Sequence, residues 1–193
     1  MAKIYIVGDI FGCANELDAL LGTLDFSGDN KAVFLGNYID YGPDSRSVVD
    51  LVSDLQGNYG ESKIIALRGK HEDAFLAWLD DPVSAQWFME DEDLATCSTF
   101  MKKKTWESFE GVLFEKAMEE LSTSAKIAID EDYGYLVEWM RKLPTKHKMD
   151  DLDLIFTKST VLEGGQMHDL KGTPHKDGQI PLLVYDTDQA NFL

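Results

Sequence analysis

The sequence is poor in cysteine and in basic residues, and it contains no long hydrophobic run. Its 193 residues include two cysteines, Cys13 and Cys97, and 18 lysines and arginines against 35 aspartates and glutamates. Two cysteines without metal-ligand spacing predict free thiols in a reducing compartment. No stretch approaches the ~18 apolar residues of a membrane span, and the apolar run near the first residue is interrupted too early for a signal peptide. We therefore expect a cytoplasmic location and no association with a membrane.

The scarcity of basic residues leaves a formal net charge of -17. An anionic surface repels the phosphates of DNA and RNA, so direct nucleic-acid binding is not expected. The charge favours a protein partner of basic character, or it simply keeps the surface well solvated. The charge predicts no particular oligomeric state.

The residues that are present are typical of a globular chain, with 44% hydrophobic and 11% aromatic residues. Short apolar runs at residues 3–7, 32–35 and 63–67 predict buried strands, and a loop and a helical pattern follow each of them. The strand pattern returns at residues 152–156 and 181–185. This alternation predicts an α/β fold with functional residues at the carboxyl ends of the strands.

The segment from about residue 73 to 142 has a different character. Tryptophan and phenylalanine recur there at helical spacing, and acidic runs interrupt them at residues 80–81, 90–93 and 130–132. We interpret the segment as a helical insert within a single domain that spans residues 1–193. The acidic runs are typical of loops and solvated helix faces, and a partner-binding surface is the alternative.

Glycine-rich polar segments directly follow the first three predicted strands. They are Gly8 to Gly12 (GDIFG), Gly36 to Gly42 (GNYIDYG) and Gly69 to Glu72 (GKHE). Their order and spacing resemble the signature of calcineurin-like metallophosphoesterases, Gly-Asp-x-His-Gly, Gly-Asp-x-x-Asp-Arg-Gly and Gly-Asn-His-Glu. Residues 155–158 and 171–174 are similar to the later motifs, so the resemblance covers nearly the whole chain. It is nearest to small phosphatases and diadenosine-tetraphosphate hydrolases of bacteria and phages, and it implies two packed mixed sheets flanked by helices.

Most metal-ligand positions of that family carry other residue types here. The resemblance implies two metal ions that share a bridging aspartate and activate a water for attack on phosphorus. Asp9 matches the first ligand. The remaining positions depart from the pattern: Phe11 replaces a histidine, Asn37 the bridging aspartate, Tyr41 the phosphate-clamping arginine, Lys70 an asparagine, and Lys158 and Gly172 two further histidines. We therefore predict no metal and no cofactor.

The acid–base pair of the family is retained. Asp40 and His71 match a pair in which the histidine protonates the leaving group and the aspartate orients the histidine. Without metals or the clamping arginine, the electrostatic stabilisation that dominates phosphoryl transfer is missing. We therefore predict that Asp9, Asp40 and His71 are vestigial and that the protein is not an enzyme. The specific expectation is a binding or regulatory pseudoenzyme, such as a phage inhibitor of a basic host factor.

The lysines suggest how the fold tolerates the loss of metal ions. A buried carboxylate without a cation is costly, so we expect Lys70 and Lys158 to pair with Asp9. A rebuilt metal site from His147, His168 and His175 is the less favoured interpretation.

Two other functions remain open from the residues. The first is a residual phosphoesterase with an altered centre or a single metal ion held by Asp9, Asn37 and His71. The second is a nucleotide- or phosphate-binding module without hydrolysis, in which Arg46, Arg68 and Lys70 supply the positive charge.

Overall fold

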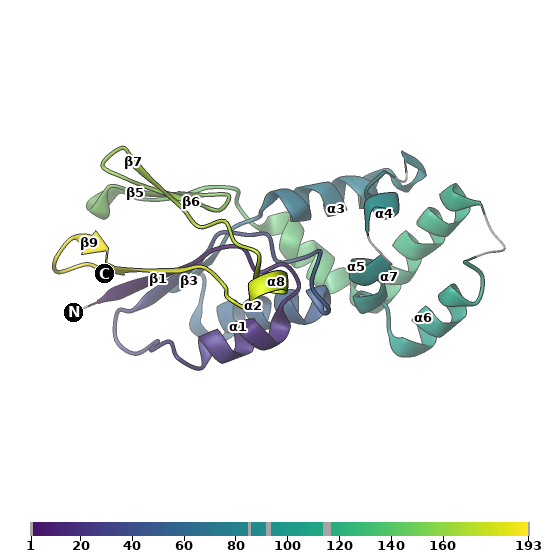
Figure 1. Cartoon of the computed structure of the whole chain (residues 1–193), viewed down its shortest axis with the longest axis horizontal. Coiled ribbons are helices and arrows are strands. Elements are labelled where there is room, and N and C mark those ends of the chain that lie inside the picture. Colours follow the sequence, from purple (N-terminus) through teal and green to yellow (C-terminus); the bar gives the residue numbers. More distant parts are fainter. Residues whose placement is uncertain (1, 85, 92–93, 114–116, 193) are drawn as a thin grey trace.

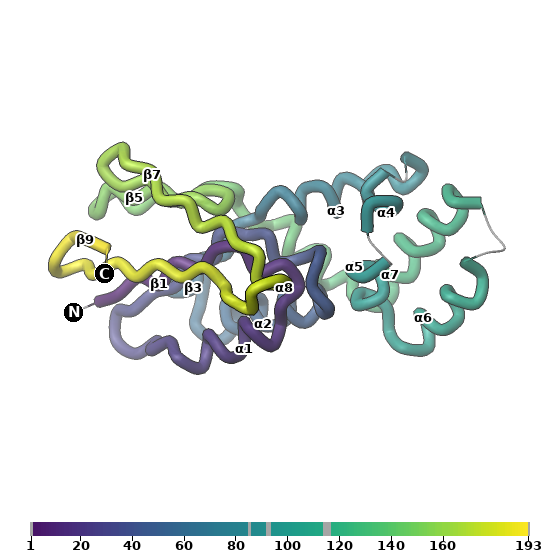
Figure 2. The backbone as a smooth tube through the Cα atoms, in the orientation of Figure 1, coloured from purple at the N-terminus to yellow at the C-terminus, as the bar shows by residue number. Residues whose placement is uncertain are grey.

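Two β-sheets lie at one end of the elongated molecule, and a group of helices extends to the other end (Figure 1). The structure is a computed structural model that describes residues 2–84, 86–91, 94–113 and 117–192. Residues 92 and 93 of the predicted acidic run at 90–93 lie outside the described residues. The backbone trace shows that both ends of the chain lie at the sheet end of the molecule (Figure 2).

The first sheet has five strands in the order β3-β2-β1-β8-β9. Their bounds are Ile64–Ala66, Lys31–Phe34, Lys3–Val7, Leu182–Asp186 and Asn191–Phe192. Strand β1 is parallel to β2, and β2 is parallel to β3, whereas β8 runs antiparallel to β1. The three parallel strands therefore end at the same edge, where the three glycine-rich segments begin.

The second sheet has four antiparallel strands in the order β4-β5-β6-β7. Their bounds are His147–Met149, Leu154–Thr157, Thr160–Glu163 and Gln166–Asp169. The expectation that both sheets are mixed is corrected here. Short hairpin connections join consecutive strands, and such connections permit only antiparallel neighbours.

Strand β1 separates two hydrophobic clusters because successive side chains point to opposite faces of the sheet. Ile4 and Ile6 pack with Phe156 in the cluster that also holds residues of the second sheet. Tyr5 and Val7 belong to the larger cluster, which includes residues of the helices. The predicted fold class, two sheets flanked by helices in a mixed α/β chain, is confirmed.

Helices follow the parallel strands, as the alternating pattern predicts. Helix α1 spans Ala14–Leu21 and α2 spans Ser45–Tyr59. The helical segment between β3 and β4 contains α3, η1, α4, α5, α6 and α7, with bounds Lys70–Asp80, Pro82–Ser84, Gln86–Glu90, Ala95–Thr99, Lys103–Glu110 and Met118–Lys142. The short elements η3 (Asp150–Leu152) and α8 (Pro174–Asp177) complete the described helices.

Aromatic side chains form the interior of the helical segment. The Trp78 ring stacks on Phe88 with 5.6 Å between centroids, and Phe75 contacts both Trp87 and Phe100. Burial of such rings stabilises the packing of α3 on α4 and α5. Within the described residues, no helix has both the length and the apolar character to cross a membrane. The cytoplasmic location stays a prediction.

Candidate active site

A buried glutamate joins the loops that follow β2 and β3. The Glu72 side chain is 0% exposed. Its carboxylate accepts hydrogen bonds from the backbone N–H groups of Asn37 at 2.9 Å, Tyr38 at 2.7 Å and Gly69 at 2.8 Å. Burial raises the pKa of Glu72, although these hydrogen bonds act in the opposite direction. The site loops are therefore held together by a group that the solvent cannot reach.

Asp9 is also buried, and uncharged donors surround it. Its Oδ1 atom accepts hydrogen bonds from Asn37 Nδ2 at 2.8 Å and from the Ser159 hydroxyl at 2.5 Å. Its Oδ2 atom accepts from the backbone N–H of Gly172 at 3.2 Å. Three neutral donors thus stabilise a carboxylate that is only 3% exposed.

The expectation that Lys70 and Lys158 neutralise Asp9 is wrong. The Lys158 ammonium pairs with Asp73, and Arg68 Nε pairs with the same carboxylate at 2.7 Å. Lys70 is exposed, and neither lysine is a partner of Asp9 in the described part of the chain. The physical reason is that Asp73, in the first turn of α3, attracts the nearby cations while hydroxyl and amide groups already satisfy Asp9.

The residues present do not fit a two-metal centre. Phe11 is 7% exposed, and its phenyl ring fills the position where the resemblance implies a ligand histidine. The Asn37 amide directs its NH₂ group at Asp9, because its Oδ1 accepts the backbone N–H of Lys70 at 3.0 Å. Among residues 2–84, 86–91, 94–113 and 117–192, no three His, Cys, Asp or Glu side chains gather as metal ligands. A single ion on Asp9, Asn37 and His71 fits no better, since Asn37 offers Asp9 a donor and the Nδ1 atom of His71 faces Asp40.

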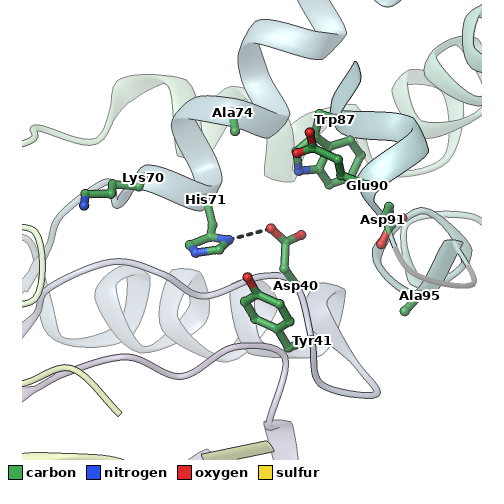
Figure 3. A pocket seen from close by; sticks show the side chains of 9 residues that line it. All are labelled: Asp40, Tyr41, Lys70, His71, Ala74, Trp87, Glu90, Asp91 and Ala95. Atoms are coloured by element: carbon green, nitrogen blue, oxygen red, sulfur yellow. Dashed lines mark hydrogen bonds and ion pairs between the residues drawn. The ribbon is translucent and has the colours of Figure 1, made fainter. Parts of the chain in front are cut away.

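The structure does bring Asp40 and His71 together. The Nδ1 atom of His71 lies 2.7 Å from Asp40 Oδ2, and the side chains are 25% and 16% exposed (Figure 3). A carboxylate oxygen accepts hydrogen bonds, so Nδ1 carries a hydrogen and its N–H group donates the hydrogen bond to Asp40. Burial alone would lower the pKa of His71, but the hydrogen bond and negative charge of Asp40, together with the charges of Glu72 and Asp9, outweigh it and raise the pKa above 6.5. The imidazole is therefore oriented by Asp40, and its protonated form is stabilised.

Three further rings, those of Phe11, Tyr41 and His175, cluster with the imidazole of this pair. The Phe11 ring contacts Tyr41, His71 and His175 edge-on, with centroids 5.1, 4.9 and 5.9 Å away. Tyr41 stacks on His175 at 5.0 Å. Phe11 and Tyr41 have φ angles of 48° and 60°, which bulky residues rarely adopt. Strained backbone of this kind concentrates at functional sites, so the two residues mark the loops as functional candidates.

The predicted phosphate-binding cations are only partly assembled at the site. Arg46 pairs with Asp50 at 2.9 Å and lies over the ring of Tyr133. Arg68 is held by Asp73, as described above. Lys70 alone of the three lines the pocket that contains His71, and its side chain points away from Asp40 (Figure 3).

The three histidines of the rebuilt-site alternative lie apart on different elements. His147 is on β4 and stacks on Phe156, and His168 is on β7 and contacts Phe192. His175, on α8, does reach the site, and its buried Nδ1 atom has no hydrogen-bond partner in the described structure.

Sequence reasoning missed three contacts at the site, made by Ser159, His175 and Thr96. Ser159 follows a predicted strand, so its position after the fourth motif could have identified it. His175 follows the motif-like residues 171–174 but was treated as a lone polar histidine. Thr96 donates a hydrogen bond to Asp40 from a distant helix, and the sequence carries no signal for that contact.

A pocket of about 490 Å³ opens beside the Asp40–His71 pair. Asp40, Tyr41, Lys70 and His71 line one side, and Trp87 and Glu90 of α4 line the opposite side (Figure 3). This volume is within the range of small-molecule sites. The arrangement can bind a small ligand and transfer a proton to it.

A family model described as calcineurin-like phosphoesterase matches residues 2–181 of the chain. The match covers nearly the whole chain, so the predicted resemblance is confirmed.

Curated relatives match smaller shares of the chain than the family model does. The chain is 24% identical over 158 residues to the symmetrical bis(5'-nucleosyl)-tetraphosphatase of Pectobacterium carotovorum, covering 81% of this chain and 43% of the relative. It is 42% identical over 62 residues to the asymmetrical bis(5'-nucleosyl)-tetraphosphatase PrpE of Oceanobacillus iheyensis, covering 28% of this chain and 25% of the relative. The chain thus spans less than half the length of these relatives. A crystal structure of a putative diadenosine tetraphosphatase is 18% identical with a TM-score of 0.45, covering 81% of this chain and 50% of that one.

The family match and the curated relatives overturn the expectation that the protein is not an enzyme. The relatives are named as phosphatases that act on nucleoside polyphosphates. Replaced ligand positions were the basis of the earlier expectation, and they do not remove the acid–base pair, which the structure places at hydrogen-bond distance.

Proposed function

The chain belongs to the calcineurin-like phosphoesterase family, and on that premise we propose that it hydrolyses a phosphate ester with an altered active centre. The observation that carries the proposal is the Asp40–His71 pair, joined at 2.7 Å beside a pocket of about 490 Å³. The pair is the part of the family's chemistry that this chain keeps. No step in the proposal depends on a metal ion, because the residues do not fit the two-metal centre.

His71 acts as the general acid in this proposal. Asp40 holds Nδ1 of the imidazole, which leaves the other ring nitrogen to give a proton to the leaving oxygen as the P–O bond breaks. A water oxygen forms the new bond to phosphorus, and its proton passes to solvent. The raised pKa of His71 extends to higher pH the range in which the imidazole carries the proton that the acid must give.

The charges of the pocket favour one orientation of the substrate. The phosphate lies near the His71 imidazolium and Lys70, because Glu90 and Asp91 on the far side repel it. Tyr41 is 61% exposed and offers an aromatic surface at the entrance. A nucleoside phosphate meets both requirements, and the names of the relatives support this substrate class.

The test is hydrolysis of two phosphate esters with different leaving groups, p-nitrophenyl phosphate and a nucleoside 5'-monophosphate, each with added Mn²⁺ and with a chelator. The ribose alkoxide of the nucleotide is the poorer leaving group. His71→Gln should lower kcat on the poorer leaving group by about 10²–10⁴-fold. The loss on p-nitrophenyl phosphate should be smaller, since nitrophenolate leaves without a proton. Arg46→Gln is the matched control, because Arg46 pairs with Asp50 outside the pocket.

Two results would contradict the proposal. One is the absence of turnover in the wild-type protein with both substrates under both metal conditions. The other is a His71→Gln variant that is as active as Arg46→Gln on the poorer leaving group.

Binding of a basic protein is a separate proposal that rests on the net charge of -17 alone. The charge supports attraction of a cationic surface at long range, and salt weakens such attraction.

A further inference from the structure

We propose that Thr96, on α5 of the helical segment, is a positioning residue that holds Asp40 in place for His71. The proposal rests on the proposed function of the Asp40–His71 pair and assigns part of that function to the helical segment. Thr96 is not one of the residues that line the pocket, and it acts through Asp40, which does line it.

The two oxygens of Asp40 have different partners. Oδ2 accepts from His71 Nδ1 at 2.7 Å, and Oδ1 accepts from the Thr96 hydroxyl at 2.9 Å. Thr96 is 0% exposed, so water does not compete for this bond. A carboxylate held at both oxygens has little rotational freedom, which is what a proton-transfer pair requires.

Asp40, Ser45 and Thr96 form a closed ring of hydrogen bonds. Its backbone N–H donates to the Ser45 hydroxyl at 3.1 Å, and the Ser45 and Thr96 hydroxyl oxygens are 3.4 Å apart. A hydroxyl has one proton to donate. Because Thr96 gives its proton to Asp40 and Ser45 accepts from Asp40, Ser45 must be the donor to Thr96. The ring joins α2, α5 and the site loop, and bonds in such chains strengthen one another.

A second buried carboxylate fixes the position of Thr96. Asp91 accepts hydrogen bonds from the backbone N–H groups of Thr96 and Cys97, both at 2.9 Å. Asp91 is 9% exposed and lies just after α4. The start of α5 is therefore anchored, and the Thr96 hydroxyl is presented to Asp40 with a fixed geometry.

The backbone of the site loop needs this support. Asp40 has a φ of 73°, and the following residue, Tyr41, has a φ of 60°. Two consecutive residues in the left-handed region persist only where the surroundings hold them. Thr96 holds the side chain of Asp40 in that turn, and Ser45 accepts its backbone N–H.

The experiment compares Thr96→Val, which keeps the shape but removes the hydroxyl, with Thr96→Ser, which keeps the hydroxyl. Thr99→Val is the matched control, because its hydroxyl on the same helix donates to the Thr96 carbonyl and accepts from the Arg46 backbone N–H, but does not bond to Asp40. The first readout is the NMR signal of the His71 Nδ1 proton in ¹⁵N-histidine-labelled protein. We expect a protected signal in the wild type, Thr96→Ser and Thr99→Val, and rapid exchange with water in Thr96→Val.

The second readout is kinetic. Thr96→Val should lower kcat about tenfold, the equivalent of one hydrogen bond, with KM nearly unchanged and with a larger loss on the poorer leaving group. Thr96→Ser should restore kcat to within about twofold, which a packing role alone would not explain.

A protected Nδ1 signal in Thr96→Val would overturn the proposal, as would an equal loss in Thr99→Val. If Thr96→Val fails to fold, Thr96→Ala removes the hydroxyl without forcing a methyl group against Asp40, and the same NMR outcomes apply. If the wild-type protein shows no turnover, the proposed hydrolysis fails, while the NMR comparison still decides the role of Thr96.

Discussion

At the scale of single residues, the site differs from its family in what surrounds each polar group. Asp9 is stabilised by an amide, a hydroxyl and a backbone N–H. In the family pattern a metal ion would occupy that role. The Phe11 ring packs against His71 at 4.9 Å and excludes water from one side of it. Burial and the Asp40 charge then act on the His71 pKa in opposite directions, and the charge prevails.

The pH dependence of the reaction follows from this balance. If His71 is the acid, kcat/KM should fall as pH rises through its pKa, which lies above 6.5. Asp40→Asn removes the negative charge, so the pKa of His71 should fall and the alkaline limb should move to lower pH. The measurement is a pH profile of kcat/KM for both proteins, and an unmoved limb in Asp40→Asn would contradict the assignment.

The Asp40–His71 pair should also make the free energy of unfolding depend on pH. His71 has a higher pKa in the folded state than its ordinary value of 6.5. Its stabilising contribution is therefore complete below pH 6.5 and is lost as pH rises through the folded-state pKa. The free energy of unfolding of wild type relative to His71→Gln should follow this direction.

At the scale of elements, the helices of the helical segment are connected to one another by specific polar contacts as well as by apolar packing. Trp78 on α3 donates its indole N–H to the Ser122 hydroxyl on α7 at 2.7 Å. Ser122 in turn donates to the carbonyl of Pro82 at 2.6 Å. The described contacts thus tie α3, η1 and α7 together, next to the helix that begins with Lys70 and His71.

Ser122→Ala should therefore destabilise the protein. The substitution leaves the buried indole N–H of Trp78 without a partner, which costs about 1–3 kcal/mol. Urea unfolding gives the free energy of unfolding. Ser124→Ala is the matched control, since its hydroxyl makes an exposed hydrogen bond to the carbonyl of Glu120 one turn earlier in the same helix. Equal stability of the two variants would show that the Trp78 bond contributes nothing.

At the scale of the whole molecule, excess negative charge opposes folding. The net charge of -17 produces repulsion between surface carboxylates, and salt screens it. The exposed ion pairs, such as Lys103 with Glu107, also weaken in salt but contribute little each. Repulsion should prevail, so stability should rise with ionic strength.

The test is thermal unfolding between about 10 mM and 200 mM NaCl, a range over which the screening length falls severalfold. If screening contributes about 1 kcal/mol, Tm should rise by about 2–4 °C for a chain of this size. A fall in Tm would mean that the ion pairs outweigh the repulsion.

The sequence by itself determined the strands that carry the site, and the family. Apolar runs at residues 3–7, 32–35 and 63–67 match β1, β2 and β3 to within a residue or so, because short buried strands have few alternatives in an apolar run. Each is followed by a glycine-rich loop, and parallel pairing brings those loops to one edge. The proximity of Asp40 to His71 follows from that geometry.

Only the tertiary structure decided which groups satisfy the polar atoms of the site. Lys158 pairs with Asp73 and not with Asp9, and Thr96 bonds to Asp40 across 56 positions of sequence. Such contacts depend on how helices pack, and residue type alone does not reveal the direction of a side chain. The sequence also did not predict strands β6 and β7 of the second sheet, because neither contains a buried apolar run. The strands are encoded locally, whereas the hydrogen bonds that orient Asp40 exist only after distant segments have packed together.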